Sequence, residues 1–82
     1  MSGPARSDKR VVNQVGQALR RLRLERDFAM KVVASRSGVT RSMLSRYEHG
    51  RQLPTLSTLV KILRVLDCSV EEFGSRLGPC LG

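Results

Sequence analysis

Apolar residues recur every three or four positions along most of the chain, and turn-forming residues interrupt this pattern in several places. Such spacing indicates α-helices, because an α-helix has 3.6 residues per turn. Aromatic residues make up 4% of the sequence, which suits an aliphatic helical core better than an aromatic-rich β-barrel. A chain of 82 residues has material for one small domain. We therefore expect an all-α fold, a compact bundle of five short helices.

The first three expected helices are separated by short turns. The second spans residues 30–37 and ends at Gly38, because glycine readily adopts the left-handed conformation found after helices. The third spans about residues 41–48, with Thr40 as its N-cap. Residues 38–40 then form a tight turn. The first helix begins at the start of an apolar stripe that consists of Val12, Val15, Leu19 and Leu22.

The fourth expected helix provides the main wall of the core, and a fifth helix follows it. Thr55 is the N-cap of the fourth helix, and Ser69 with Glu72 forms a capping box at the start of the fifth. Asp67, which tolerates the left-handed conformation better than most residues, lies between them. The apolar residues expected to face the core from these two helices are Leu56, Leu59, Val60, Ile62, Leu63, Leu66, Val70, Phe73 and Leu77.

The two ends of the chain lack the helical pattern. Residues 1–11 combine Ser, Gly, Pro and mixed charge, so we expect a flexible basic arm before a folded domain at residues 12–77. Gly78 and Pro79 break the last helix and leave residues 78–82 as a tail. No apolar run approaches the ~20 residues of a membrane helix, and the first ten residues lack a signal-peptide core. We expect a soluble, cytoplasmic protein that does not contact a membrane.

Basic residues outnumber acidic ones by fifteen to seven, which gives a formal net charge of +8, and twelve of the fifteen are arginine. Residues 1–51 hold twelve basic and four acidic side chains, whereas residues 52–82 hold three of each. The entire excess therefore lies in the first part of the chain. Arginine binds phosphate and guanine through forked donors, so this distribution favours a polyanionic partner. The alternative is a basic surface that only keeps the protein soluble.

Side chains suited to metal, redox or catalytic chemistry are few. Cys68 and Cys80 are too few for a disulfide framework and lack metal-ligand spacing, and His49 has no partner ligand. The sequence shows no acid, base and nucleophile that could converge. We expect no metal, no cofactor and no enzymatic activity. Cys68 is expected to lie in the core as a small hydrophobe, and Cys80 in the loose tail.

Two charged residues occupy positions that face the core. Arg23 falls inside the apolar stripe of the first helix, and Glu48 lies at the apolar border of the third. A buried guanidinium needs a carboxylate partner. A structural ion pair between Arg23 and Glu48 explains both positions without any substrate, and we prefer it to the alternative, a catalytic role.

A Gly-Val-Thr turn before a polar-faced third helix resembles the Cro/Xre-type helix-turn-helix family of phage and bacterial repressors. The similarity covers about residues 13–77. It implies a lambda-repressor-like DNA-binding domain whose second and third helices form the motif, with the third, about residues 41–48, in the major groove of double-stranded DNA. The matching residues are Val15-Gly16, Leu19, Leu22, Arg23, Ala34, Gly38-Val39-Thr40, the run from Arg41 to Gly50, Pro54-Thr55-Leu56, Leu59 and the run from Ser69 to Phe73.

The resemblance also implies a function and a set of DNA contacts. A member of this family is expected to be a sequence-specific transcriptional regulator, such as a repressor, that binds a palindromic operator as a homodimer. The alternative for its polar third helix is an ordinary solvated face. The expected base-contacting residues are Arg41, Ser42, Ser45 and Arg46. The expected phosphate-contacting residues are Met30, Lys31, Thr40, His49 and Arg51.

The start of the second helix departs from the family pattern. The family has Thr or Ser as the N-cap followed by Gln, whereas this chain has Ala29 and Met30. Neither side chain can cap the helix or donate to a phosphate. The backbone N–H groups and Lys31 would have to hold the DNA backbone there.

The sequence leaves two surfaces and one function open. The residues Arg6, Lys9 and Arg10 either wrap DNA or form an idle basic arm. The apolar residues Leu24, Val65, Leu77, Cys80 and Leu81 form either a dimer surface or scattered exposed positions. The alternative function is a protein-interaction module, such as an antitoxin that sequesters a toxin, and the transcription machinery is another protein partner to consider.

Overall fold

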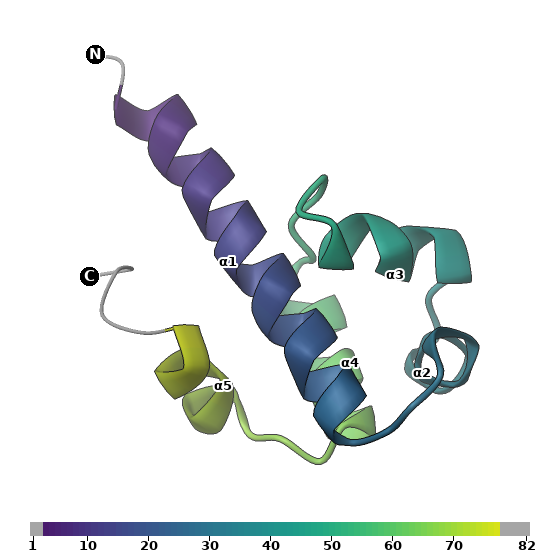
Figure 1. Ribbon diagram of the computed structural model, residues 1–82. Coiled ribbons are helices and arrows are strands. Elements are labelled where there is room, and N and C mark those ends of the chain that lie inside the picture. The colour runs from purple at the N-terminus through teal and green to yellow at the C-terminus, as the bar shows by residue number, and fades with distance from the viewer. Residues whose placement is uncertain (1–2, 78–82) are drawn as a thin grey trace.

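The computed structural model describes residues 3–77, which form five α-helices and no strand (Figure 1). The all-α, five-helix architecture predicted from the periodicity is confirmed. Within residues 3–77, no helix combines the length and the apolar character needed to cross a membrane. The helices are α1 (Gly3–Glu25), α2 (Met30–Ser37), α3 (Arg41–Glu48), α4 (Leu56–Val65) and α5 (Val70–Leu77).

Local features fix the ends of these helices. Gly38 ends α2 with a φ of 77°, and Asp67, which follows α4, has a φ of 55°. Thr40 Oγ1 accepts a hydrogen bond of 3.0 Å from the backbone N–H three residues on. Thr55 and Ser69 cap α4 and α5 in the same way, at 3.2 and 3.0 Å. The turns and N-caps predicted at these five residues are confirmed.

The prediction of a flexible arm at residues 1–11 is wrong for the part that the structure describes. α1 begins at Gly3 and not at Val12, so residues 3–11 are helical. Pro4 fits because proline is tolerated in the first turn of a helix, where its missing N–H would have no partner. Val11, at the end of this segment, packs partly on the core, and no apolar stripe precedes it in the sequence. The predicted tail, residues 78–82, lies outside the described residues.

The core is mainly aliphatic, with the aromatic residues Tyr47 and Phe73, and draws side chains from all five helices. Cys68 is 8% exposed and joins this core, as predicted. Leu56 and Val70, which were predicted to face the core, are 70% and 49% exposed. Each is the first residue of its helix, where apolar periodicity does not ensure that another helix covers the side chain. The large side chains that are fully buried are Leu19, Leu22, Val33, Leu44, Ile62, Leu63, Leu66 and Phe73.

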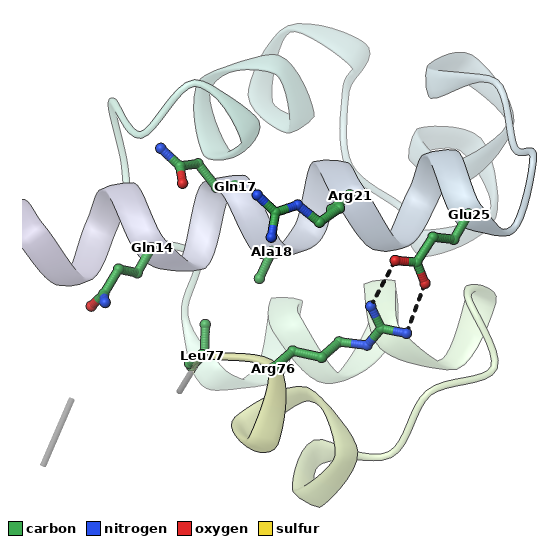
Figure 2. A pocket seen from close by; sticks show the side chains of 7 residues that line it. All are labelled: Gln14, Gln17, Ala18, Arg21, Glu25, Arg76 and Leu77. Atoms are coloured by element: carbon green, nitrogen blue, oxygen red, sulfur yellow. Dashed lines mark hydrogen bonds and ion pairs between the residues drawn. The ribbon is translucent and has the colours of Figure 1, made fainter. Parts of the chain in front are cut away.

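α1 packs against α3 and α5, which lie on different sides of it (Figure 1). Charged contacts attach α5 to the end of α1: Arg76 Nη2 and Nη1 donate to the two carboxylate oxygens of Glu25 at 2.8 and 3.1 Å (Figure 2). Arg26 Nε donates to the carbonyl oxygen of Leu66 at 2.9 Å and holds the turn after α4. The side of α1 that carries α3 is thus separate from the side that carries α5.

Candidate nucleic-acid interface

α2 and α3 are joined by a turn with little conformational freedom. Gly38 adopts the left-handed conformation that glycine favours, and no described atom lies within 4 Å of the position its Cβ would take. The N–H of Val39 donates to the carbonyl oxygen of Ala34 at 3.1 Å, and Thr40 then caps α3. Because each residue of the turn is fixed by backbone geometry or a hydrogen bond, α2 and α3 form a rigid helix-turn-helix unit.

α3 has one buried and one exposed face. Leu44 and Tyr47 are 1% and 5% exposed and anchor the helix on the core. The structure brings the four predicted base-contacting residues to the opposite face, and no acidic side chain lies among them. Three of these residues are exposed and the fourth, Ser45, is half-buried; the exposed ones are Arg41, Ser42 and Arg46.

Glu48, the last residue of α3, is held by Arg23 of α1. Arg23 Nε donates to Glu48 Oε2 at 2.7 Å, and Nη2 donates to Oε1 at 3.0 Å. The remaining Nη1 donates to the carbonyl oxygen of Phe28 at 2.9 Å. The hydrogen bond to Glu48 raises the pKa of Arg23, so the guanidinium stays charged. The structure therefore contains the ion pair, which ties the end of α3 to α1 and to the loop before α2.

The backbones of α1 and α3 approach each other closely at Gly16. A Cβ on Gly16 would overlap the carbonyl oxygen of Tyr47 and lie 3.0 Å from that of Glu48. One turn earlier in α1, the side chain of Asn13 occupies the space that a Cβ on Gly50 would take. α1 therefore supports α3 at its C-terminal end through both backbone contact and the ion pair.

The segment after α3 presents two further predicted contact residues. His49 is the C-cap, and its Nδ1 lies 2.8 Å from the carbonyl oxygen of Ser45 and 3.3 Å from the Ser45 Oγ. Gly50 has a φ of 69°, and the N–H of Arg51 donates to the carbonyl oxygen of Arg46 at 2.9 Å. Both His49 and Arg51 are exposed. Backbone hydrogen bonds thus hold these side chains beside the exposed face of α3.

The N-terminus of α2 is uncapped by any side chain. Ala29 occupies the N-cap position and makes no side-chain hydrogen bond. Met30 is half-buried and packs against the core, whereas Lys31 is exposed. The groups that can attract an anion at this end are the backbone N–H groups, the positive end of the helix dipole and Lys31.

Comparison with known proteins decides the family. The helix-turn-helix family model matches residues 19–73, which include the whole of α2, α3 and α4. The chain belongs to the Cro/Xre-like helix-turn-helix family. It is 35% identical over 60 residues to the HTH-type transcriptional regulator PuuR of Escherichia coli K12, an overlap that covers 73% of this chain and 32% of PuuR. The chain thus spans about a third of the length of PuuR.

A shorter relative matches over most of its length. The uncharacterized HTH-type transcriptional regulator y4dJ of Sinorhizobium fredii is 38% identical over 58 residues, which cover 71% of this chain and 75% of the relative. These relatives carry the names of regulators, and the helix-turn-helix is a DNA-binding motif. The described helices therefore make up a DNA-binding domain of the transcription-regulator type.

Two solved structures share this arrangement of helices. The restriction-modification controller protein C.AhdI from Aeromonas hydrophila has a TM-score of 0.73 at 28% identity, over 77% of this chain and 96% of that chain. The clp gene regulator ClgR from C. glutamicum has a TM-score of 0.80 at 24% identity, over 88% of this chain and 92% of that chain. At this identity, the similarity supports a shared fold and nothing more.

Exposed positive charges recur at five-residue intervals along the helix-turn-helix domain. Between residues 30 and 51 the one acidic residue is Glu48, and it is buried against Arg23. Every exposed formal charge in this segment is therefore positive. The exposed cationic residues are Lys31, Arg36, Arg41, Arg46 and Arg51.

Asn13 of α1 adds a polar side chain beside this surface. Asn13 is exposed beside Gly50 and was not among the residues predicted from the sequence, because the proximity of α1 to this turn is a tertiary contact without a local signal.

Cys68 lies in the core, where burial raises the pKa of its thiol. Among residues 3–77, no three His, Cys, Asp or Glu side chains gather to hold a metal ion. Cys80 lies outside the described residues.

Proposed function

We propose that this domain is a sequence-specific transcriptional regulator that inserts α3 into the major groove of double-stranded DNA. The observation that carries the proposal is the acid-free, exposed face of α3, on which Arg41 and Arg46 stand while Glu48 is turned inward to Arg23. The major groove is wide enough to admit an α-helix. The uncapped N-terminus of α2 supplies a second, sequence-independent anchor for the DNA backbone.

Arg41 and Arg46 carry most of the base recognition. Each guanidinium can donate two hydrogen bonds to O6 and N7 of guanine, which is the commonest specific contact in the major groove. Ser42 and Ser45 are small, so they let the backbone of α3 approach the bases, and their hydroxyls can bond to bases or phosphates. Specificity therefore depends mainly on the two arginines.

Residues around α3 contact the phosphates. His49 and Arg51 reach the backbone at the C-terminal end of α3, and Lys31 with the N–H groups near Met30 reaches it at the start of α2. Thr40 Oγ1 already accepts the capping bond, so its hydroxyl hydrogen remains available for a phosphate oxygen. These contacts set the register of the domain on DNA without reading its sequence.

The domain acts as a homodimer on a palindromic operator. Two recognition helices ~34 Å apart enter successive major grooves on one side of the duplex. Val70 of α5, which is 49% exposed, supports a contact between two copies on the side that carries α5. Leu24 of α1 is also exposed, at 52%. Val65 and Leu77 pack partly on their own core and contribute less. Contact through this end leaves α3 free for DNA.

Selection of bound sequences from a random duplex pool tests this proposal. We expect one enriched motif, palindromic, with half-sites about one helical turn apart. A folded protein that enriches no motif would contradict sequence-specific binding and favour a role in binding a protein, such as a toxin. A single non-palindromic half-site, bound by a monomer in sedimentation, would contradict the homodimer alone.

The salt dependence of DNA affinity tests the phosphate contacts separately. We expect ~4–7 contacts per subunit, each contributing about −0.9 to the slope of log affinity against log salt. An affinity that does not change between low and moderate salt would show that the positive surface of residues 30–51 does not bind the DNA backbone.

A further inference from the structure

The N-terminal half of α1 lies beyond the point where α1 crosses α3. The crossing is at Gly16, whose backbone meets the carbonyl oxygens of Tyr47 and Glu48. α1 begins at Gly3, so ~20 Å of helix precedes the crossing at a rise of about 1.5 Å per residue. In Figure 1 this half of α1 projects past the other four helices. It therefore presents side chains that the helix-turn-helix unit does not supply.

The helical register places Lys9 on the side of α1 that carries α3. Residues seven apart differ by only ~20° around an α-helix, so Lys9 shares a face with Gly16. Asn13, one turn after Lys9, occupies the space beside Gly50 on that side. Lys9 is exposed. It lies ~6 Å along the axis of α1 from the residue that contacts the turn after α3.

Arg10 is also exposed but lies on another side of α1. It comes seven residues before Gln17, which lines the groove between α1 and α5 together with Arg76 and Leu77. Successive residues of an α-helix are about 100° apart, so Lys9 and Arg10 carry the same charge on different faces. The face of Lys9 is the one that continues towards the end of α3.

We propose that Lys9 contacts a DNA phosphate from α1, outside the helix-turn-helix unit. The inference rests on the proposed function, in which Arg51 reaches the DNA backbone at the C-terminal end of α3. Duplex DNA carries one negative charge per ~1.7 Å of its axis, so further phosphates follow the one that Arg51 contacts. Lys9 extends the positive surface along this backbone, and its ammonium group can donate to a phosphate oxygen.

The support of a helix makes this contact specific in position. α1 is fixed relative to α3 by the close approach at Gly16 and by the ion pair between Arg23 and Glu48. Lys9 therefore has a set distance from the exposed face of α3, which a flexible arm would not give it. Less conformational freedom is also lost when an already ordered segment binds. We infer that Lys9 meets one particular phosphate in each half-site and helps to set the angle of α3 in the groove.

The test compares wild type with Lys9→Gln on a mixed-sequence duplex, because phosphate contacts do not depend on base sequence. We expect the slope of log affinity against log salt to fall by about 0.9 per subunit. The affinity lost by the variant should therefore shrink about 3.5-fold between ~50 and ~200 mM salt. Lys9→Arg keeps the charge and should retain the wild-type slope. Glutamine and lysine have similar helix propensities, so circular dichroism should show unchanged helix content.

Arg10→Gln is the matched control, since it removes one positive charge from the neighbouring position on another side of α1. It should keep the wild-type salt slope. Equal losses of slope in Arg10→Gln and Lys9→Gln would show that only the overall charge of this segment matters, and would overturn the inference. An unchanged slope in Lys9→Gln also overturns it and leaves the proposed function standing. A folded wild-type protein that binds no duplex overturns the proposed function itself.

Ethylation interference locates the contact on the DNA. Ethylation removes the charge of one phosphate at a time, so ethylating the phosphate that Lys9 contacts should weaken wild type and have no further effect on Lys9→Gln. On the duplex enriched by selection, we expect such a phosphate in each half-site, separate from those that lose their effect in Arg51→Gln. Identical interference patterns for wild type and Lys9→Gln would overturn the inference.

Discussion

The 2.7 Å hydrogen bond from Arg23 Nε to Glu48 Oε2 joins the C-terminal part of α1 to the last residue of α3. The side chains of Arg23 and Glu48 are 10% and 1% exposed, so water competes little for either group. The bond fixes one end of α3, and the Thr40 cap fixes the other. The orientation of the exposed face therefore depends on a pair of residues that does not itself lie on that face.

Glu48→Ala is expected to lower the free energy of unfolding by ~3–5 kcal/mol, because it leaves the buried guanidinium of Arg23 without a carboxylate. Replacing both residues with apolar ones of similar size, Arg23→Met with Glu48→Leu, should cost much less, because no charge is then buried. Urea unfolding measures both values. Equal losses in the single and the double variant would show that packing, and not the unpaired charge, makes the pair important.

The ion pair was predictable because each of its residues can be recognised within its own helix, as a charged residue inside or beside an apolar stripe. The same is true of the caps, since Thr40, Thr55 and Ser69 act within one turn of their own helix. Local signals therefore predict most of the fold and the exposed face of α3.

Features that depend on how one helix packs against another could not be predicted from such local signals. Leu56 continues the apolar period of α4 but is 70% exposed. Residues 3–11 have no period to detect, although they continue α1. The contact between Asn13 and Gly50 joins distant parts of the chain. Periodicity gives the face of a helix, whereas coverage and contact depend on tertiary packing.

Gly16→Ala should destabilise the domain by ~1–3 kcal/mol, because its Cβ would overlap the Tyr47 carbonyl oxygen and push α1 away from α3. Gly74→Ala in α5 is the matched control, since no described atom lies within 4 Å of that Cβ position. Alanine favours helix more than glycine does, so this control should gain ~0.5–1 kcal/mol. Thermal unfolding measures both changes. Opposite effects are expected, and a stabilised Gly16→Ala variant would disprove the close approach.

The ion pair between Arg76 and Glu25 should make stability depend on pH. Hydrogen bonding to Arg76 lowers the pKa of Glu25 in the folded state. A lowered folded pKa stabilises the fold above the pKa of the unfolded carboxyl, and this contribution disappears as the pH falls through the folded pKa. Arg76→Gln should therefore lower the Tm slightly at neutral pH and have no such effect once Glu25 is protonated.

The effect is expected to be small because both side chains are partly exposed, at 27% for Arg76 and 44% for Glu25, and salt screens such pairs. Glu25→Gln provides the control: it should show the same small loss at neutral pH, and the double variant should lose no more than either single one. A difference between wild type and Arg76→Gln that persists unchanged into acid would mean that Arg76 acts through packing and not through the carboxylate of Glu25.

Arg41→Ala and Arg46→Ala should each reduce the preference for the selected operator over random duplex by ~1–3 kcal/mol per lost guanine contact. Arg51→Ala, as a phosphate contact, should weaken operator and random duplex about equally and reduce the salt slope by about 0.9 per subunit. All three residues are exposed, so the variants should keep the wild-type Tm.

Arg41→Lys separates the charge of this residue from its geometry, because lysine keeps the charge but lacks the fork that contacts O6 and N7 together. It should retain affinity for random duplex and lose discrimination at one base pair in each half-site. If operator preference survives in Arg41→Ala and Arg46→Ala while both still bind DNA, the face of α3 contacts only the backbone, and base recognition must come from another part of the protein.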